Sequence, residues 1–262
     1  MTGSGRVAVV TGAARGIGAA TTAALARDGW CVVAVDACAD DPALGYPLAT
    51  REDLEALLRP DGSVTTVVAD VRDLTALAHA VDTARETYGG IDAAIAVAGV
   101  IAGGAPHWET DVAAERAVVD VDLVGVMNLA RVALPALLAR PEPRHGRFIA
   151  VASAAARQGL PRLAAYCAAK AGVTGFIRGL AADLRGTGVT ANAVSPGSTD
   201  TAMLAESARV YDLANAEVFA QQQPVERLLE PAEIAAAIAW LAGTGTDGIT
   251  GADVPVDGGL SL

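Results

Sequence analysis

Short apolar runs alternate along the chain with longer alanine-rich stretches. The runs predict strands at residues 7–11, 31–36, 64–69, 93–98, 147–152 and 189–194. The longer stretches predict helices that begin near Gly16, Asp73, Ala113, Leu163 and Pro231. Because the strand runs are apolar throughout, rather than at every second position, they indicate a parallel sheet covered on both faces. The pattern therefore predicts an α/β fold, a Rossmann-type doubly wound parallel sheet flanked by helices on both faces.

One connection is longer than the rest. Residues 37–63 separate the second and third predicted strands and start with a turn-rich piece that ends at Pro47. A short helix is predicted after it, with Thr50 as N-cap and Asp53 at the capping-box position. The segment is either an ordinary surface helix with a long lead-in loop or an insertion with a role of its own. Since no low-complexity linker interrupts the chain, we expect a single domain over 1–262 with an insertion at about 37–63.

Composition narrows the class of protein. Of the 262 residues, 52% are hydrophobic, which is enough to bury a large core and excludes an intrinsically disordered chain. The formal net charge of −11 argues against nucleic acid or an anionic membrane as a partner, because both are bound by clustered lysine and arginine. Residues 1–6 lack the basic and apolar regions of a signal peptide, and charged residues interrupt the apolar stretches. We therefore expect a cytoplasmic protein that does not span a membrane.

Residues of the metal-binding types are few and scattered. The three cysteines, Cys31, Cys38 and Cys167, lack zinc-type spacing, and the three histidines show no ligand pattern. We expect neither a disulfide framework nor a metal site.

The first predicted strand runs into a glycine-rich turn, which opens the first predicted helix. Gly12, Gly16 and Gly18 allow the backbone to turn sharply and to approach a pyrophosphate, whose charge then lies at the helix N-terminus. A tight strand-to-helix loop needs glycine for reasons of its own, so the turn alone is a weak signal. Its place between a strand and a helix, at the start of an alternating chain, favours dinucleotide binding.

Two residues bear on the choice of dinucleotide. Asp36 ends the second predicted strand, 18 residues after Gly18, where its carboxylate can accept hydrogen bonds from ribose hydroxyls and repel a 2′-phosphate. Arg15 in the glycine-rich turn favours the opposite choice, because a cation there can hold that phosphate. We give the carboxylate more weight, since an unpaired charge opposed to a phosphate costs more than one cation contributes. NAD is therefore expected rather than NADP.

A serine, a tyrosine and a lysine form a candidate catalytic group. Ser153 follows the fifth predicted strand, and Tyr166 and Lys170 are one helical turn apart on the next helix, so they share a face. A tyrosine with its ordinary pKa near ~10 is a poor base at neutral pH, but a neighbouring ammonium lowers that pKa by stabilising the phenolate. Lys170 is the only lysine of the chain, and the other 18 cations are arginine. Either a compact ammonium is needed here, where a planar guanidinium does not serve, or the lysine survives by chance.

Taken together, these motifs resemble the short-chain dehydrogenase/reductase family over essentially the full chain. The family order is matched by Thr11-Gly12-x-x-x-Gly16-x-Gly18, Asp36, Asp70-Val71, Ala98-Gly99, Ser153 with Tyr166-x-x-x-Lys170, Ser195-Pro196-Gly197 and Val256-Asp257-Gly258-Gly259. The resemblance implies that Tyr166 is the general acid and base, that Lys170 binds the nicotinamide ribose and lowers the pKa of Tyr166, and that Ser153 positions the substrate oxygen. It also implies a set of NAD-binding residues: Gly12, Arg15, Gly16, Ile17, Gly18, Asp36, Asp70, Val71, Ala98, Gly99, Tyr166, Lys170, Pro196, Gly197, Thr199 and Thr201.

The long second connection resembles the insertion of one subgroup, the mycofactocin-associated dehydrogenases related to carveol dehydrogenase. It leaves Asp36 and must pass near the adenosine half of the cofactor, where it could slow cofactor release. The subgroup implies an NAD that stays bound and is reoxidised by an external redox carrier. The family implies a homotetramer.

The chain departs from the family pattern at two places. Ala96-Val97 stands where the family has two asparagines, which removes side-chain hydrogen bonds but leaves close backbone approach at Ala98-Gly99. Asp122 stands where the family has an asparagine that helps to hold a water near Lys170. A carboxylate there favours the ammonium and opposes the phenolate. We hypothesise that Asp122 takes over the proton relay, and the alternative is a solvated aspartate on the helix surface.

The function expected from these residues is an NAD(H)-dependent oxidoreductase that interconverts a secondary alcohol and its ketone. A mobile lid is expected at about 200–223, and its apolar residues favour a small apolar substrate such as a terpenoid, a sterol or an aliphatic alcohol. Two alternatives stay open. One is an enzyme with freely exchanging NAD(P), such as a 3-oxoacyl-type reductase, and the other is an NAD(H)-binding sensor without turnover.

Overall fold

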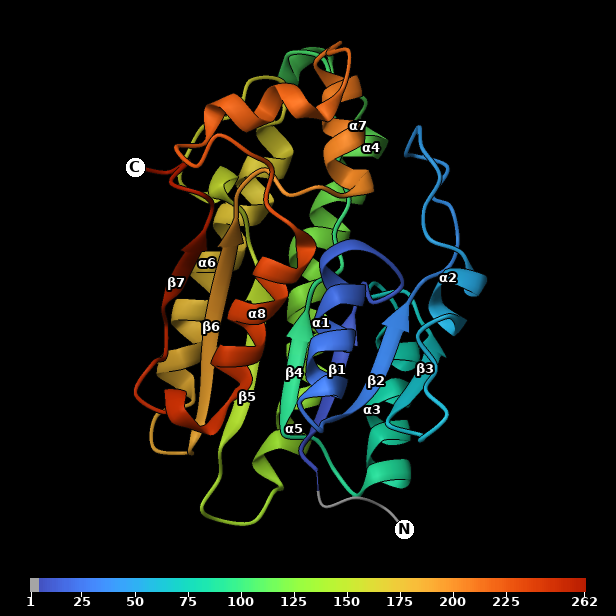
Figure 1. The fold of residues 1–262 in the computed structure, drawn as a ribbon, viewed down its shortest axis with the longest axis vertical. Coiled ribbons are helices and arrows are strands. Elements are labelled where there is room, and N and C mark those ends of the chain that lie inside the picture. The colour runs from blue at the N-terminus through green and yellow to red at the C-terminus, as the bar shows by residue number, and fades with distance from the viewer. Residues whose placement is uncertain (1–4) are drawn as a thin grey trace.

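The computed structural model describes residues 5–262, whose strands form a sheet in the order β3-β2-β1-β4-β5-β6-β7, each parallel to its neighbours (Figure 1). The strands are β1 Val7–Thr11, β2 Cys31–Asp36, β3 Val64–Val68, β4 Ala93–Ala96, β5 Gly146–Val151, β6 Val189–Pro196 and β7 Asp253–Val256. The chain builds outward from β1 to β3 and then returns to β4, so the strand order reverses between β1 and β4. This confirms the predicted doubly wound parallel sheet. The signal-peptide prediction for residues 1–6 rests partly on residues 1–4, which lie outside the described residues.

The sheet has a seventh strand that the sequence prediction missed. β7 has only four residues, is partly exposed at the sheet edge and contains Pro255. A proline inside a short apolar run argues against a strand, except at an edge, where one side needs no hydrogen-bond partner. The prediction of six strands was therefore wrong, because it left out this edge strand. β3 also ends one residue earlier than predicted, and β4 ends two residues earlier.

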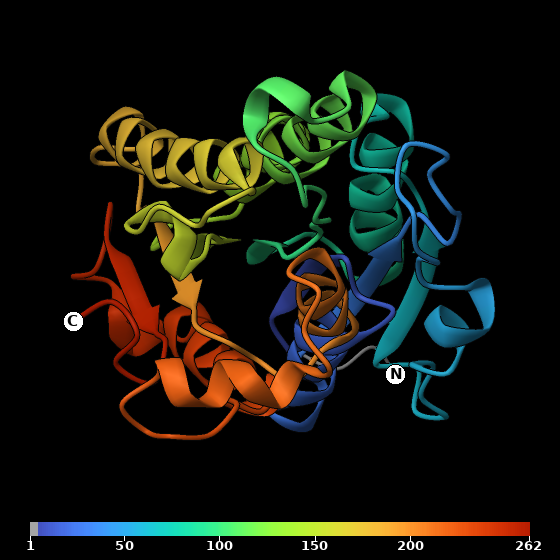
Figure 2. The same cartoon turned by 90° about the horizontal axis from the view of Figure 1, so that it is seen from above.

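The uninterrupted apolar runs are explained by burial on both faces. In β1, Val7 and Val9 belong to one hydrophobic cluster, while Ala8 and Val10 belong to a second one, and all four are nearly fully buried. The first cluster includes residues of α3 (Leu74–Tyr88), α5 (Gly125–Leu138) and α6 (Ala164–Asp183). The second includes residues of α1 (Gly16–Arg27) and α8 (Pro231–Ala242). Figure 2 shows the two helical layers on opposite sides of the sheet.

The helix predicted from Ala113 does not run on regularly. It consists of α4 (Val112–Val119), a π-helical turn (Asp120–Val124) and α5. The stretch Val112–Leu138 is long and apolar enough to cross a membrane by length and composition, but half of its most apolar window is buried, and α5 packs on α3 and β4. Such a window is also found in core helices of proteins that stay in water. The π turn adds a residue to one turn and so changes which side chains face inward.

The remaining elements are short helices and turns. The predicted capping box is confirmed, because Thr50 Oγ1 accepts the Asp53 N–H at the start of α2 (Arg51–Glu55) and Asp53 returns a bond to the Thr50 N–H. The predicted lid region contains α7 (Ala202–Val210) and a 3₁₀ segment (Ala216–Gln222). Further 3₁₀ turns are His107–Glu109, Ala154–Ala156 and Thr244–Thr246.

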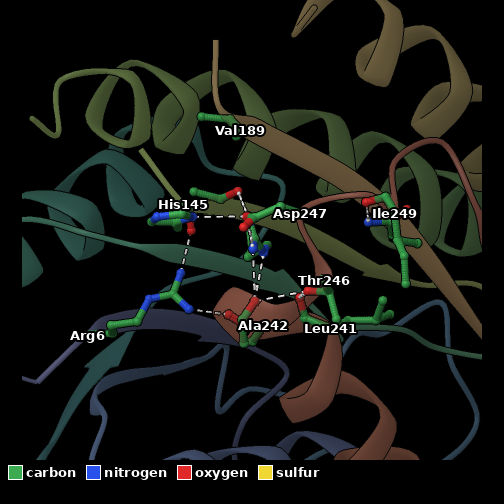
Figure 3. A network of polar contacts seen from close by, with 12 residues as sticks. Arg6, His145, Val189, Leu241, Ala242, Thr246, Asp247 and Ile249 are labelled. Carbon is green, nitrogen blue, oxygen red and sulfur yellow. Dashed lines mark hydrogen bonds and ion pairs between the residues drawn. The ribbon is translucent and has the colours of Figure 1, made fainter. Parts of the chain in front are cut away.

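At the opposite end of the sheet, two arginines bind the C-terminus of α8. Arg6 donates to the Ala242 and His145 carbonyls (Figure 3). The side chain of Arg147 is fully buried, and its Nε lies 3.1 Å from the Gly243 carbonyl oxygen, while its Nη2 lies 2.6 Å from Asp247 Oδ1. Carbonyls at a helix C-terminus carry partial negative charge and are stabilised by nearby cations. These contacts fasten α8 to the sheet far from the ends that form the site described next.

We predict that Arg147→Ala lowers the free energy of unfolding by about 3 kcal/mol, because it removes a buried cation that satisfies helix-end carbonyls and leaves a cavity. Urea denaturation followed by circular dichroism measures the change. Arg27→Ala, at a side chain that is 75% exposed, is the matched control and should leave the midpoint unchanged. Equal midpoints for the two variants would contradict this account.

Candidate active site

A cavity of about 690 Å³ lies where the carboxyl ends of the strands meet. This volume suits a cofactor together with a small molecule. The segments that follow β1, β2, β3, β4, β5 and β6 all contribute to its wall. The residues singled out from the sequence that line it are Gly12, Arg15, Gly16, Ile17, Gly18, Asp36, Asp70, Val71, Ala98, Gly99, Ser153, Tyr166, Lys170, Pro196, Gly197, Thr199 and Thr201. Asp122 does not line the cavity and lies behind it.

The glycine-rich turn packs so closely against neighbouring backbone that side chains would not fit at two of its positions. Gly12 has a φ of +64°, and a Cβ there would lie 2.5 Å from the Cα of Ala98. A Cβ on Gly18 would lie 1.9 Å from the carbonyl oxygen of Gly12. Arg15, the N-cap of α1, makes no side-chain cap, and the first turn of α1 holds no acidic residue. The first turn of α1 therefore has neither a side-chain cap nor an acidic residue of its own, as expected of a turn that receives an anion.

Asp36 is fixed at the end of β2 by backbone amides. Its Oδ2 accepts the Ala14 N–H at 3.0 Å and its Oδ1 accepts the Cys38 N–H at 3.3 Å. Arg15, the residue that favours a 2′-phosphate, instead donates to the Pro47 carbonyl at 3.2 Å. The carboxylate is thus presented to the cavity by the backbone, while the guanidinium is held by the inserted segment.

Residues 37–49 form a strap along the cavity. The strap contributes Ala37, Ala39, Asp41, Leu44, Tyr46, Leu48 and Ala49 to the cavity wall. Tyr46 reaches across to the loop after β4, where its hydroxyl oxygen accepts the Ile101 N–H at 2.9 Å. Burial raises the pKa of Tyr46 to about 12, so this phenol is neutral at physiological pH. The segment is thus a short surface helix, α2, whose long lead-in loop lines the cavity.

Arg72 links the strap to Asp70, one of the residues that the family resemblance assigns to NAD binding. Its Nη2 lies 2.6 Å from Asp70 Oδ2, and its Nη1 lies 2.6 Å from Asp41 Oδ2 in the strap. Burial alone would raise the pKa of the Asp70 carboxyl, but hydrogen bonds from Arg72 hold it below its usual value. Neither Arg72 nor Asp41 was predicted from the sequence to be part of the site. The available signal was a cation two residues after Asp70, but nothing in the sequence pairs that cation with a carboxylate thirty-one positions earlier.

The catalytic candidates meet at the middle of the cavity. Ser153 follows β5 and caps the 3₁₀ turn, since its Oγ accepts the Ala155 N–H at 3.1 Å. Tyr166 and Lys170 project from one face of α6, with Nζ 5.6 Å from the centre of the tyrosine ring. Lys170 Nζ donates to the Val151 carbonyl at 3.2 Å. Burial raises the pKa of Tyr166, while the Lys170 ammonium and the Ser153 hydroxyl act to lower it.

Asp122 is completely buried in the π turn. Its Oδ2 lies 3.1 Å from Lys170 Nζ, and its Oδ1 accepts the Val100 N–H at 2.8 Å. The alternative of a solvated surface aspartate is therefore wrong. Burial raises the pKa of the Asp122 carboxyl, and Lys170 opposes that rise. Burial also acts to lower the pKa of Lys170, but Asp122 and Tyr166 outweigh it and raise that pKa above its ordinary value.

The open end of the cavity is apolar. Met203, Leu204, Tyr211, Leu213, Val218 and Phe219 from the lid region line it together with Leu160, Pro161 and Leu163. Tyr211 Oη donates to the Pro161 carbonyl at 2.7 Å, and the Tyr211 ring packs edge-on against Phe219. The lid segment is therefore tied to the loop after β5. Among residues 5–262, no group of three or more histidine, cysteine or acidic side chains is placed to hold a metal ion.

The fold and the cavity define a nucleotide-binding Rossmann protein with a serine, a tyrosine and a lysine at its centre. The family model described as "Enoyl-(Acyl carrier protein) reductase" matches residues 12–261. The chain belongs to the short-chain dehydrogenase/reductase family of oxidoreductases, so the family resemblance read from the motifs is confirmed.

Relatives of known name cover nearly the whole chain. It is 38% identical to cis-4-hydroxycyclohexanecarboxylate dehydrogenase of Sinomonas cyclohexanicum, over 98% of this chain and 96% of the relative. It is 33% identical to (-)-trans-carveol dehydrogenase of Rhodococcus erythropolis, over 98% of each chain. Among solved structures, carveol dehydrogenase from Mycobacterium avium in complex with NAD has a TM-score of 0.90 at 30% identity, over 99% of this chain and 98% of that one.

Proposed function

We propose that this protein is an NAD(H)-dependent oxidoreductase that interconverts a small apolar secondary alcohol and its ketone. The observation that carries the proposal is that Tyr166, Lys170 and Ser153 meet in one cavity with the open glycine-rich turn. Two relatives are named as dehydrogenases of secondary alcohols, which are cis-4-hydroxycyclohexanecarboxylate in one case and (-)-trans-carveol in the other.

The residues of the cavity fit NAD. Gly12 and Gly18 let the turn pack closely, and the turn brings the uncapped first amides of α1 to the cavity, where a pyrophosphate would lie. The Asp36 carboxylate suits two free ribose hydroxyls and disfavours a 2′-phosphate, and Arg15 is engaged by the strap. The similar structure from Mycobacterium avium contains NAD. When bound, NAD supplies a nicotinamide carbon that accepts hydride from an alcohol or gives hydride to a ketone.

The side chains handle the proton and orient the substrate. Tyr166 Oη takes the hydroxyl proton during alcohol oxidation and returns it during ketone reduction. Its burial disfavours the phenolate, so the Lys170 ammonium is needed to stabilise that form. Ser153 accepts a backbone N–H with its oxygen, which leaves its hydroxyl hydrogen to donate to the substrate oxygen. The apolar open end, lined by Met203 and Phe219 among others, favours an apolar carbon skeleton.

The strap supports a cofactor that is held tightly. Three polar contacts fasten it at separate points, through Arg72 to Asp41, through Tyr46 to Ile101 and through Arg15 to Pro47. Residues of this strap line the cavity beside Asp36, at the end where the adenosine is expected. A retained cofactor needs reoxidation in place, which fits an external, mycofactocin-like redox carrier. The homotetramer and the cytoplasmic location stay predictions from the family resemblance and the composition.

We predict that Tyr166→Phe lowers kcat for alcohol oxidation by on the order of 10²–10⁴, because the proton acceptor is lost while the ring still fills its place. Steady-state assays with a panel of apolar secondary alcohols measure it. Tyr88→Phe is the matched control, since this tyrosine at the end of α3 bonds to Thr65 of β3 and does not line the cavity. A Tyr166→Phe variant as active as Tyr88→Phe would refute the role, whereas cofactor binding without turnover in the unmodified protein would favour a sensor.

We predict that Asp41→Asn speeds release of bound NAD by on the order of tenfold, because it weakens a charge-assisted contact between the strap and Arg72. Displacement of radiolabelled NAD by excess unlabelled NAD measures the rate. Asp82→Asn, at an exposed ion pair on α3, serves as the control. If unmodified protein and both variants release NAD equally fast, the strap does not retain the cofactor, and a freely exchanging enzyme is the better description.

A further inference from the structure

The buried pair of Asp122 and Lys170 puts a negative charge beside the group that Tyr166 needs. Lys170 is 3% exposed and Asp122 is 0% exposed, so water screens neither charge. Their side-chain atoms are 3.1 Å apart, and the remaining oxygen of Asp122 is held by the Val100 amide. The pair as a whole is neutral. Lys170 therefore offers Tyr166 much less positive potential than an unpaired ammonium would.

The surrounding backbone packs closely against the pair. Asp122 sits in the π turn between α4 and α5, and the added residue of that turn directs the carboxylate inward rather than along the outer face. A Cβ on Gly99 would lie 3.3 Å from both Asp122 Oδ2 and Lys170 Nζ, so the chain before Val100 passes directly over the pair. Lys170 Nζ also donates to the Val151 carbonyl, while its side chain lines the cavity.

We propose that Asp122 is a positioning residue that keeps Lys170 an ammonium ion and, by cancelling part of its charge, sets the pH at which the Tyr166–Lys170 unit gives up its proton. The inference rests on the proposed role of Tyr166 as the proton-transfer group. Two further ionisable groups lie close to the unit. Tyr46 of the strap interacts with Asp122 and its phenol stays neutral, while Cys167 of α6 interacts with Tyr166. Asp122 then supplies the negative charge that tunes the unit.

The sign of the effect follows from charge alone. The carboxylate stabilises every state of the unit that keeps its proton and disfavours every state that has lost it. Removing the carboxylate therefore moves the first proton loss to lower pH, whichever of Tyr166 and Lys170 bore that proton. A role limited to packing predicts no such shift.

The single lysine of the chain makes a direct test possible. Protein grown with lysine labelled with ¹³C at the ε carbon gives one lysine side-chain signal, that of Lys170. In the unmodified protein we expect the chemical shift of this signal to remain that of the ammonium form up to a pH above the ordinary lysine pKa of 10.5. A midpoint at or below 10.5 overturns the inference without any variant.

The variant Asp122→Asn keeps the shape and removes the charge. We expect the Lys170 midpoint to fall by about one pH unit or more, and the ascending limb of kcat/KM for alcohol oxidation to move to lower pH by a similar amount. Asp92→Asn is the matched control, because Asp92 also pairs with a cation, Arg140, and accepts a backbone N–H, but lies at the amino end of β4. The control should leave both midpoints in place, even if it lowers stability.

The outcomes separate this inference from the proposed function. If Asp122→Asn folds and moves neither midpoint, the carboxylate does not tune the unit and the inference is overturned. If the lysine midpoint falls while neither protein oxidises any alcohol, the electrostatic part stands and the proposed function fails. A shift of the kinetic limb to higher pH also overturns the inference, because it has the wrong sign.

Discussion

The close approach of two backbone turns, one after β1 and one after β4, is the constraint on which the site depends. Strand order reverses between these neighbouring strands, so their following segments diverge and open a cavity between them. The approach is possible only because Gly12 has no side chain to meet Ala98. Every candidate for cofactor binding and catalysis that lines this cavity comes from a segment that leaves the same end of the sheet.

Two cations near the cavity are paired with carboxylates. Arg72 is shared by Asp70 and Asp41, and Lys170 is paired with Asp122. Such pairs hold distant pieces of chain in place, because breaking either one leaves a partly or fully buried charge without a partner. The first pair ties the strap to the sheet, and the second fixes the lysine beside Tyr166. Under the proposed function, retention of the cofactor and transfer of the proton both depend on ion pairs of this kind.

The sequence predicted most of what local pattern controls. The central strands are apolar because both faces are buried, so their runs are unmistakable, and the capping box of Thr50 and Asp53 is a local bond. β7 was missed because an edge strand is short and tolerates Pro255. The π turn and the burial of Asp122 were missed because they arise from how α4 and α5 pack, not from helical periodicity. The bridge from Arg72 to Asp41 was missed for the same reason, since it joins residues far apart in the chain.

The most direct test of the central claim follows hydride itself. A panel of apolar secondary alcohols, each carrying deuterium on the carbinol carbon, is incubated with the protein and NAD, and the nicotinamide is then analysed by mass spectrometry. The account predicts that deuterium from at least one alcohol appears on the nicotinamide, and that none appears with Tyr166→Phe in the same time. NAD that binds in the cavity but gains no deuterium from any alcohol, and loses none to the matching ketones, would contradict it.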